Sequence, residues 1–248
     1  MGALRANFTS VLCFDPICTA RPPGALQRLA PLARRFRAKW LSALALALAC
    51  VFPSARAWDA QIMLLAAQPH GSQAVAGVRA LQLLLGTLAG RDDEERLGAI
   101  NQFFNRRIAF ASDLEVWGQL DYWASPLEML QKGRGDCEDY VIGKYFSLLA
   151  AGVPTSRLRL VYVRAMVQGV VLAHMVLAYY PTPGAEPLIL DSLISDIRPA
   201  SRRPDLTPVF SFNTDGLWQG TGELRQGDPL ARLSRWREVL SKAHAEGF

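Results

Sequence analysis

The feature that most constrains this chain is a short polar segment that leads directly into an apolar helix. Residues 133–140 read Gly-Arg-Gly-Asp-Cys-Glu-Asp-Tyr, and the residues that follow have the apolar composition of a buried helix. The pattern places Cys137 in the first turn of that helix, with Asp136, Glu138 and Asp139 around it. A thiol at a helix N-terminus is a candidate nucleophile, because the helix dipole favours the thiolate.

Basic residues are concentrated at the start of the chain. The whole chain has 27 basic and 22 acidic residues, of which 8 basic residues and 1 acidic residue lie in residues 1–57. Residues 58–248 therefore carry 19 basic and 21 acidic groups, a net charge of −2. The main part of the chain lacks the basic surface that nucleic-acid binding requires, so we expect no nucleic-acid partner.

The basic segment has the layout of an export signal. Basic residues at 34–39 precede an apolar run at 40–52, and Ala55-Arg56-Ala57 supplies the small residues of a cleavage site. The run is shorter than the ~20 residues of a membrane span, although a retained anchor is the alternative. We expect cleavage after Ala57 and export to a bacterial periplasm. The mature chain, residues 58–248, would form one domain without a membrane span.

Cysteine usage depends on this cleavage. Cys13, Cys18 and Cys50 all lie before the expected cleavage site, so Cys137 is the only cysteine left in the mature chain. A lone exported cysteine forms no internal disulfide. It could be a small buried apolar residue. Its two charged neighbours argue against that interpretation, because core positions seldom lie between charged groups.

The remaining pattern predicts an α+β fold with N-terminal helices and an antiparallel sheet. Helical spacing covers 72–89 and 92–105, whereas 107–124 fits no single period and is expected to form a structured loop with short extended pieces. Ser125-Pro126-Leu127-Glu128 is a capping box that opens a short helix ending at Gly133. Later segments predict a cysteine helix at 136–151, strands at 157–164, 170–180 and 187–191 in a meander, and a last helix from Asp228.

Three residues on successive elements form a candidate catalytic set. Cys137 opens the helix, His174 lies in the second strand, and Asp191 ends the third strand. His174 would deprotonate the thiol, and Asp191 would orient the imidazole. Each residue also has a structural alternative: His174 could be a hydrogen-bonded core residue, and Asp191 could form a turn.

Three carboxylates, those of Asp136, Glu138 and Asp139, lie next to the candidate nucleophile in the sequence. Carboxylates close to a thiolate raise its pKa and oppose its formation. A bound cation would remove this conflict, and hard oxygen ligands favour Ca²⁺ over zinc. Asp113 or Asp121 could add a ligand. Alternatively, Asp136, Glu138 and Asp139 only cap the helix and interact with its dipole.

The chain resembles the bacterial transglutaminase-like cysteine proteinases, and within them the LapG-type periplasmic proteases. The matching segments cover most of residues 92–220. They are Trp117-Gly118, 121–128, 133–140, 173–177, 190–193, 208–213 and 216–218. The segment around Cys137 is the most specific of them, whereas 58–91 matches only in helical character.

This resemblance implies a papain/transglutaminase-like fold in which Cys137, His174 and Asp191 are the catalytic triad. It implies that Asp136, Glu138 and Asp139 surround a Ca²⁺ ion needed for activity. Relatives cut a large surface adhesin near its N-terminus, at a small-residue pair such as Ala-Ala, and so release biofilm cells. A LapD-type inner-membrane receptor holds them inactive when cytoplasmic cyclic di-GMP is high. One departure is Ser112-Asp113, where paired acids are expected.

Two other functions use the same sequence features. A transglutaminase or amidase would use the same Cys-His-Asp set for a different acyl transfer. A non-catalytic binding module would instead dock a receptor through exposed Trp117, Trp123 or Trp218.

Overall fold

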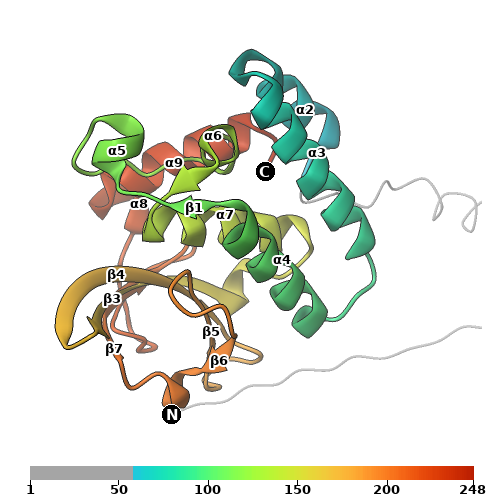
Figure 1. Ribbon diagram of the computed structural model, residues 1–248. Helices are drawn as coiled ribbons and strands as arrows, with labels where there is room; N and C mark the ends of the chain where they lie inside the picture. The colour runs from blue at the N-terminus through green and yellow to red at the C-terminus, as the bar shows by residue number, and fades with distance from the viewer. Residues whose placement is uncertain (1–57) are drawn as a thin grey trace, which may run out of the picture. The chain divides into compact units, whose positions relative to one another are not determined.

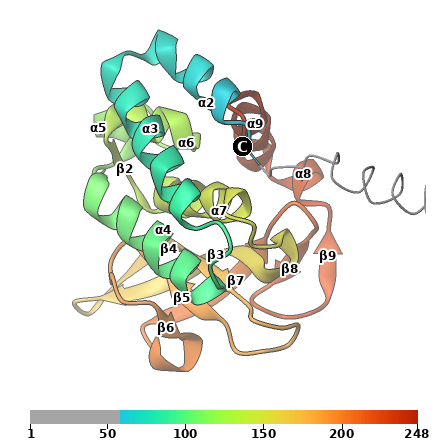
Figure 2. The ribbon, with the colours of Figure 1, turned by 90° about the vertical axis from the view of Figure 1, so that its right-hand side faces the viewer.

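The structure places α-helices beside an antiparallel sheet, as Figures 1 and 2 show from two directions. It is a computed structural model that describes residues 58–248, and the predicted export signal lies outside the described residues. The helices are Ala60–Ala67 (α2), Ser72–Thr87 (α3), Asp93–Arg107 (α4), Asp113–Trp117 (α5), Pro126–Lys132 (α6), Cys137–Ala150 (α7), Pro229–Arg232 (α8) and Ser234–Ala245 (α9). The predicted α+β fold class, with a cysteine at the start of a central helix, is confirmed.

The main sheet contains seven antiparallel strands in the order β6-β5-β4-β3-β7-β8-β9. The strands are Leu158–Val167 (β3), Val170–Tyr179 (β4), Leu188–Leu190 (β5), Arg198–Pro199 (β6), Leu206–Phe212 (β7), Leu217–Gln219 (β8) and Arg225–Gly227 (β9). The predicted meander corresponds to β3, β4 and β5, which are neighbours in the sheet. Gln168 and Gly169 join β3 to β4 with φ of 50° and 82°, as a tight two-residue hairpin turn requires.

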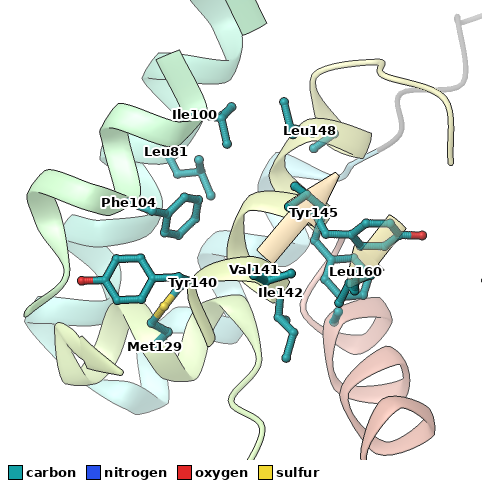
Figure 3. Packing of buried hydrophobic residues seen from close by; sticks show 14 of the residues in the cluster. Leu81, Ile100, Phe104, Met129, Tyr140, Val141, Ile142, Tyr145, Leu148 and Leu160 are labelled. Atoms are coloured by element: carbon teal, nitrogen blue, oxygen red, sulfur yellow. The ribbon is translucent and has the colours of Figure 1, made fainter. Parts of the chain in front are cut away.

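Helix α7 lies between the other helices and the sheet, and it is buried on almost every side. Every residue from Asp139 to Leu148 is buried. Figure 3 shows its side chains packed among Phe104 of α4, Met129 of α6 and Leu160 of β3. A helix that is apolar all round is expected at such a central position. Its burial fixes the direction of the helix that carries the candidate nucleophile.

Residues 107–124 are more regular than the sequence predicted. Ala109–Phe110 (β1) pairs in parallel with Arg134–Gly135 (β2), which is one of the expected extended pieces. The prediction of a loop is wrong over Asp113–Trp117, because these residues form α5. Ser112 opens this helix in a capping box with Glu115, and its N–H donates to Glu115 Oε2 at 3.1 Å. A five-residue helix is too short to show a helical period, but its capping pattern was readable.

The last helix folds back onto the segment before the cysteine. Trp236 of α9 is fully buried and stacks on Phe146 of α7, with 5.8 Å between ring centroids. Glu246 is 9% exposed and accepts hydrogen bonds from the Ser125 hydroxyl and from the Leu127 N–H at the start of α6. The C-terminus therefore supports α6 through a buried carboxylate.

The buried Glu246 carboxylate should make the stability of the fold depend on pH. Burial raises the pKa of Glu246 to about 7, although the two hydrogen bonds favour its ionised form. Because the folded pKa exceeds the unfolded value of about 4.3, the free energy of unfolding falls as the pH rises between these two values. Glu246→Gln does not titrate. We expect its stability relative to the native chain to rise by about 1–3 kcal/mol between pH 5 and pH 8, measured by urea unfolding. A difference that stays constant with pH would contradict this.

Within residues 58–248, none of the helices has both the length and the apolar character needed to cross a bilayer.

Candidate active site

Cys137 is the first residue of α7 and is half-buried. The chain enters the helix in an extended conformation at Asp136, whose N–H donates to Asp139 Oδ2 at 3.4 Å. Gly135 allows this close turn, since a Cβ there would lie 2.6 Å from Asp139 Oδ2. The Gly-Asp-Cys order therefore brings the backbone tightly against the first turn and places the thiol at the N-terminal end of the helix.

His174 and Asp191 form a buried pair. Nε2 of His174 lies 2.7 Å from Oδ1 of Asp191, and their side chains are 5% and 0% exposed. Burial alone would raise the pKa of Asp191. Hydrogen bonds from His174, the Leu193 N–H and Arg203 outweigh burial and lower that pKa to about 2. Asp191 is therefore ionised at neutral pH, and Nδ1 remains the imidazole nitrogen available to another partner.

The thiol lies beside the strand that carries the histidine. The backbone N–H of Met175, the residue after His174, lies close to the Cys137 sulfur and acts to lower the pKa of the thiol. The thiol itself donates to Glu138 Oε2 at 3.0 Å. The structure thus pairs Asp191 with Nε2 of His174 and places the Cys137 thiol close to the backbone of the next residue, Met175.

Sequence reasoning missed the residues that hold Asp191. Arg203, with a side chain 1% exposed, donates to Asp191 Oδ2 at 2.7 Å. Lys144 and Asn105 donate to the Asp191 carbonyl oxygen at 3.0 and 2.9 Å. Burial lowers the pKa of Lys144 to about 7, and the charge of Asp191 opposes this. Lys144 was detectable as a lone charge in an apolar helix, two turns after Cys137, whereas no motif marks Arg203.

The predicted metal ligands converge, and Asp113 joins them. Carboxylate oxygens of Asp113, Asp136 and Asp139 lie within 4.8 Å of one another, and so do those of Asp113, Asp121 and Glu138. Asp113 is common to both groups and is 4% exposed. Its Oδ2 accepts from the Tyr122 N–H at 2.6 Å, which ties the loop to α5. The structure therefore favours Asp113 as a ligand, a question that the sequence left open.

The chemistry of this acidic cluster fits a hard cation. Oδ1 of Asp113 and Oδ1 of Asp136 are buried and have no hydrogen-bond partner. Buried, unpaired carboxylate oxygens are costly unless a proton or a cation satisfies them. Several carboxylates without a neutral histidine ligand match the preference of Ca²⁺ for oxygen.

Crowding in the acidic cluster shifts the pKa values of its own carboxyls and of the neighbouring thiol. Burial, followed by repulsion from Glu138 and Asp139, raises the pKa of Asp136 to about 9. Burial raises the pKa of Asp139 to about 8, although the Ala124 N–H donates to it. Burial, Glu138 and Asp136 also raise the pKa of the Cys137 thiol. In the chain alone, the acids therefore oppose the thiolate, as the sequence indicated.

The tryptophans that a binding module would expose are packed into the fold. Trp117 packs on Tyr122 with 4.5 Å between centroids, and Trp123 stacks on Phe212 at 5.9 Å. Trp218 is 9% exposed. Trp117 and Trp123 are half-buried and Trp218 is buried, so none of the three side chains is fully exposed.

Known proteins resemble this chain in sequence and fold. The sequence pattern described as "Bacterial transglutaminase-like cysteine proteinase BTLCP" matches residues 86–205. LapG from Legionella pneumophila, solved after EGTA treatment, is 39% identical over 75% of this chain and 97% of its own, with a TM-score of 0.67. Its calcium-bound structure is 39% identical over 74% of this chain and 98% of its own, with a TM-score of 0.64. No protein of curated function matches significantly. The chain belongs to the family of bacterial transglutaminase-like cysteine proteinases.

Proposed function

We propose that this chain is a calcium-dependent periplasmic cysteine endopeptidase that cleaves the N-terminal region of a large surface adhesin. The observation that carries the proposal is the position of Cys137 at the start of α7, close to Met175, the residue that follows the buried His174. Membership of a cysteine proteinase family and the likeness to LapG support the reaction type. Cleavage would detach the adhesin and release biofilm cells.

The reaction would follow the roles of a cysteine protease. The Cys137 sulfur attacks the scissile carbonyl, and Nδ1 of His174 accepts the thiol proton and then donates it to the leaving amine. Asp191 holds Nε2 and stabilises the charged imidazolium. Water then attacks the acyl-enzyme with His174 as the base, which releases the new carboxyl end and restores the thiol.

Asp113, Asp136, Glu138 and Asp139 would hold the calcium ion, with Asp121 at the edge of the cluster. The proposal rests on their convergence and on the two unpaired buried oxygens. The calcium-bound LapG structure supports it. Bound calcium would supply positive charge that offsets the carboxylates beside the thiol.

The proposal includes the cellular setting. We infer that residues 1–57 direct export and are removed after Ala57, so that the periplasmic form starts at Trp58. Residues 58–248 hold their own hydrophobic core, which is compatible with this cleavage. The intact mass of the protein isolated from a periplasmic extract tests whether the mature chain begins at Trp58. A cyclic-di-GMP receptor of the LapD type in the inner membrane would control the access of this protease to the adhesin. Addition of the periplasmic domain of that receptor should therefore slow cleavage.

Product mass separates proteolysis from the alternative acyl transfer. The probe is the purified N-terminal segment of a candidate large repeat adhesin. Hydrolysis gives two fragments whose masses sum to the segment plus one water. A cross-linked species or an amine adduct would instead identify a transglutaminase or amidase with the same triad.

The buried Arg203 is expected to hold Asp191 in position beside His174. Loss of its 2.7 Å contact would leave Asp191 Oδ2 unpaired and free to rotate away from the histidine. We expect Arg203→Gln to lower kcat by about 10- to 100-fold with a smaller change in KM, as loss of one charged hydrogen bond implies. The neighbouring Arg202 is exposed, so Arg202→Gln is the matched control. Equal effects of the two variants would exclude a specific role for Arg203.

A further inference from the structure

Strand β4 has an unpaired edge close to the thiol. Its pairing with β3 extends over all ten residues to Val170, but its pairing with β5 covers only Leu177 to Tyr179. The chain turns out of the sheet at Asp191, whose Oδ1 accepts from the Leu193 N–H at 3.0 Å. Within residues 58–248, no strand covers 170–176 of β4 on the β5 side.

The register shows which backbone groups this edge presents. The Tyr180 N–H donates to the Arg157 carbonyl oxygen at 2.8 Å. Because donors alternate along an antiparallel strand, the even-numbered residues of β4 bond to β3. The odd-numbered residues direct their N–H and C=O groups to the opposite side, where Leu177 meets Leu190 of β5.

The open backbone positions are therefore those of Val171, Ala173 and Met175. The backbone N–H of Met175 lies close to the Cys137 sulfur, so the thiol is at the edge position next to the end of the β5 pairing. Val171 and Ala173 remain between the thiol and the hairpin turn. An extended chain lying along these two residues would bring its own backbone directly beside the sulfur.

The side chains of this segment also lack a partner. Val170, Val171 and Leu172 are 57%, 55% and 48% exposed, and the hairpin tip extends from the sheet at the left of Figure 1. Proteins usually protect a free edge with charges, proline or a bulge. Residues 170–173 read Val-Val-Leu-Ala and have no such protection. An apolar, unprotected edge beside a nucleophile is suited to a transient extended ligand.

We propose that the substrate adds to the sheet as an extended strand along Val171 and Ala173 before Cys137 attacks it. Backbone hydrogen bonds would align the scissile bond with the sulfur, and the apolar side chains would contact alternate substrate residues. This inference rests on the proposed function, because it takes the adhesin segment as the occupant of the edge.

Amide hydrogen exchange tests the strand addition residue by residue. The sample is the Cys137→Ala variant, which leaves the adhesin segment uncut, studied by NMR with and without saturating segment. We expect the Val171 and Ala173 amides to exchange rapidly in the free protein and at least about 10-fold more slowly in the complex. Leu172 and His174 are internal controls, because their amides already bond to β3 in both states.

A substitution on the edge gives a second measurement. Proline is tolerated where the missing N–H faces away from the ladder, so Val171→Pro should keep the β3 pairing and lose one substrate contact. We expect kcat/KM to fall about 10-fold, as loss of one backbone hydrogen bond implies, while the unfolding temperature stays near the native value. An unchanged kcat/KM would contradict the strand addition.

The outcomes separate this inference from the proposed function. Failure of the native chain to cut the segment would overturn both. Cleavage by the native chain, together with binding to Cys137→Ala that leaves the Val171 and Ala173 amides unprotected, would overturn only the strand addition. Protection that depends on protein concentration without the segment would assign the edge to a second copy of this chain, and would also overturn it.

Discussion

Cys137→Ala is expected to lower kcat/KM for the adhesin segment by about 10⁴-fold or more, because removal of a covalent nucleophile leaves only binding and polar stabilisation. The thiol lies at the N-terminal end of α7 and is the only one in residues 58–248. Iodoacetamide should therefore label the mature native chain once and the variant not at all. A variant that retains more than about one per cent of native activity would exclude Cys137 as the nucleophile.

The loss should be catalytic rather than structural. Cys137 is half-buried and fills little of the core, so the variant should unfold at nearly the native temperature. His174→Ala should cause a comparable loss of activity, and the double variant should be no worse than either single one, because residues that act as a unit are non-additive. Additive losses would show that Cys137 and His174 do not act together.

Calcium removal has the second large expected effect. We expect chelation with EGTA to reduce cleavage to background and added calcium, but not magnesium, to restore it, because a flexible multi-carboxylate site suits the larger ion. Calcium at about 100 times its dissociation constant should also stabilise the fold by about 2.7 kcal/mol, measured as a rise in unfolding temperature. Unchanged cleavage and stability in chelator would contradict the calcium requirement.

Asp113→Asn is the substitution that tests the proposed calcium site most directly. Asp113 belongs to both carboxylate groups and has an unpaired buried Oδ1, so Asp113→Asn should weaken calcium binding at least about 10-fold by calorimetry. Asp196 is exposed and belongs to neither group, so Asp196→Asn is the matched control. Equal calcium affinities of the two variants would remove Asp113 from the ligand set.

Periodicity and caps made much of the fold predictable. The helical spacing before residue 105, the Ser125 capping box and the change to period two after 157 correspond to α3, α4, α6 and the β3–β5 meander. These signals are local, so they are visible in one sequence. Helix α5 was missed because five residues are too few to establish a period.

The candidate site was only partly predictable for a different reason. Cys137, His174 and Asp191 are reactive residue types at the ends or on the faces of recognisable elements, so their positions drew attention to them. Arg203 meets Asp191 only after the chain passes through β6, and an arginine in a polar segment carries no such signal. The open edge of β4 likewise depends on where β5 stops pairing, which is a property of the sheet rather than of any segment.

In the proposed mechanism, Cys137 cleaves a polypeptide only when the neighbouring acids hold calcium. The most direct test is the rate of cleavage of the adhesin segment as calcium is titrated into the chelator-treated native chain, with Cys137→Ala in parallel. We expect a saturable rise from background to full rate in the native chain and no cleavage by the variant at any calcium concentration. Full cleavage before calcium is added, or equal cleavage by Cys137→Ala, would contradict it.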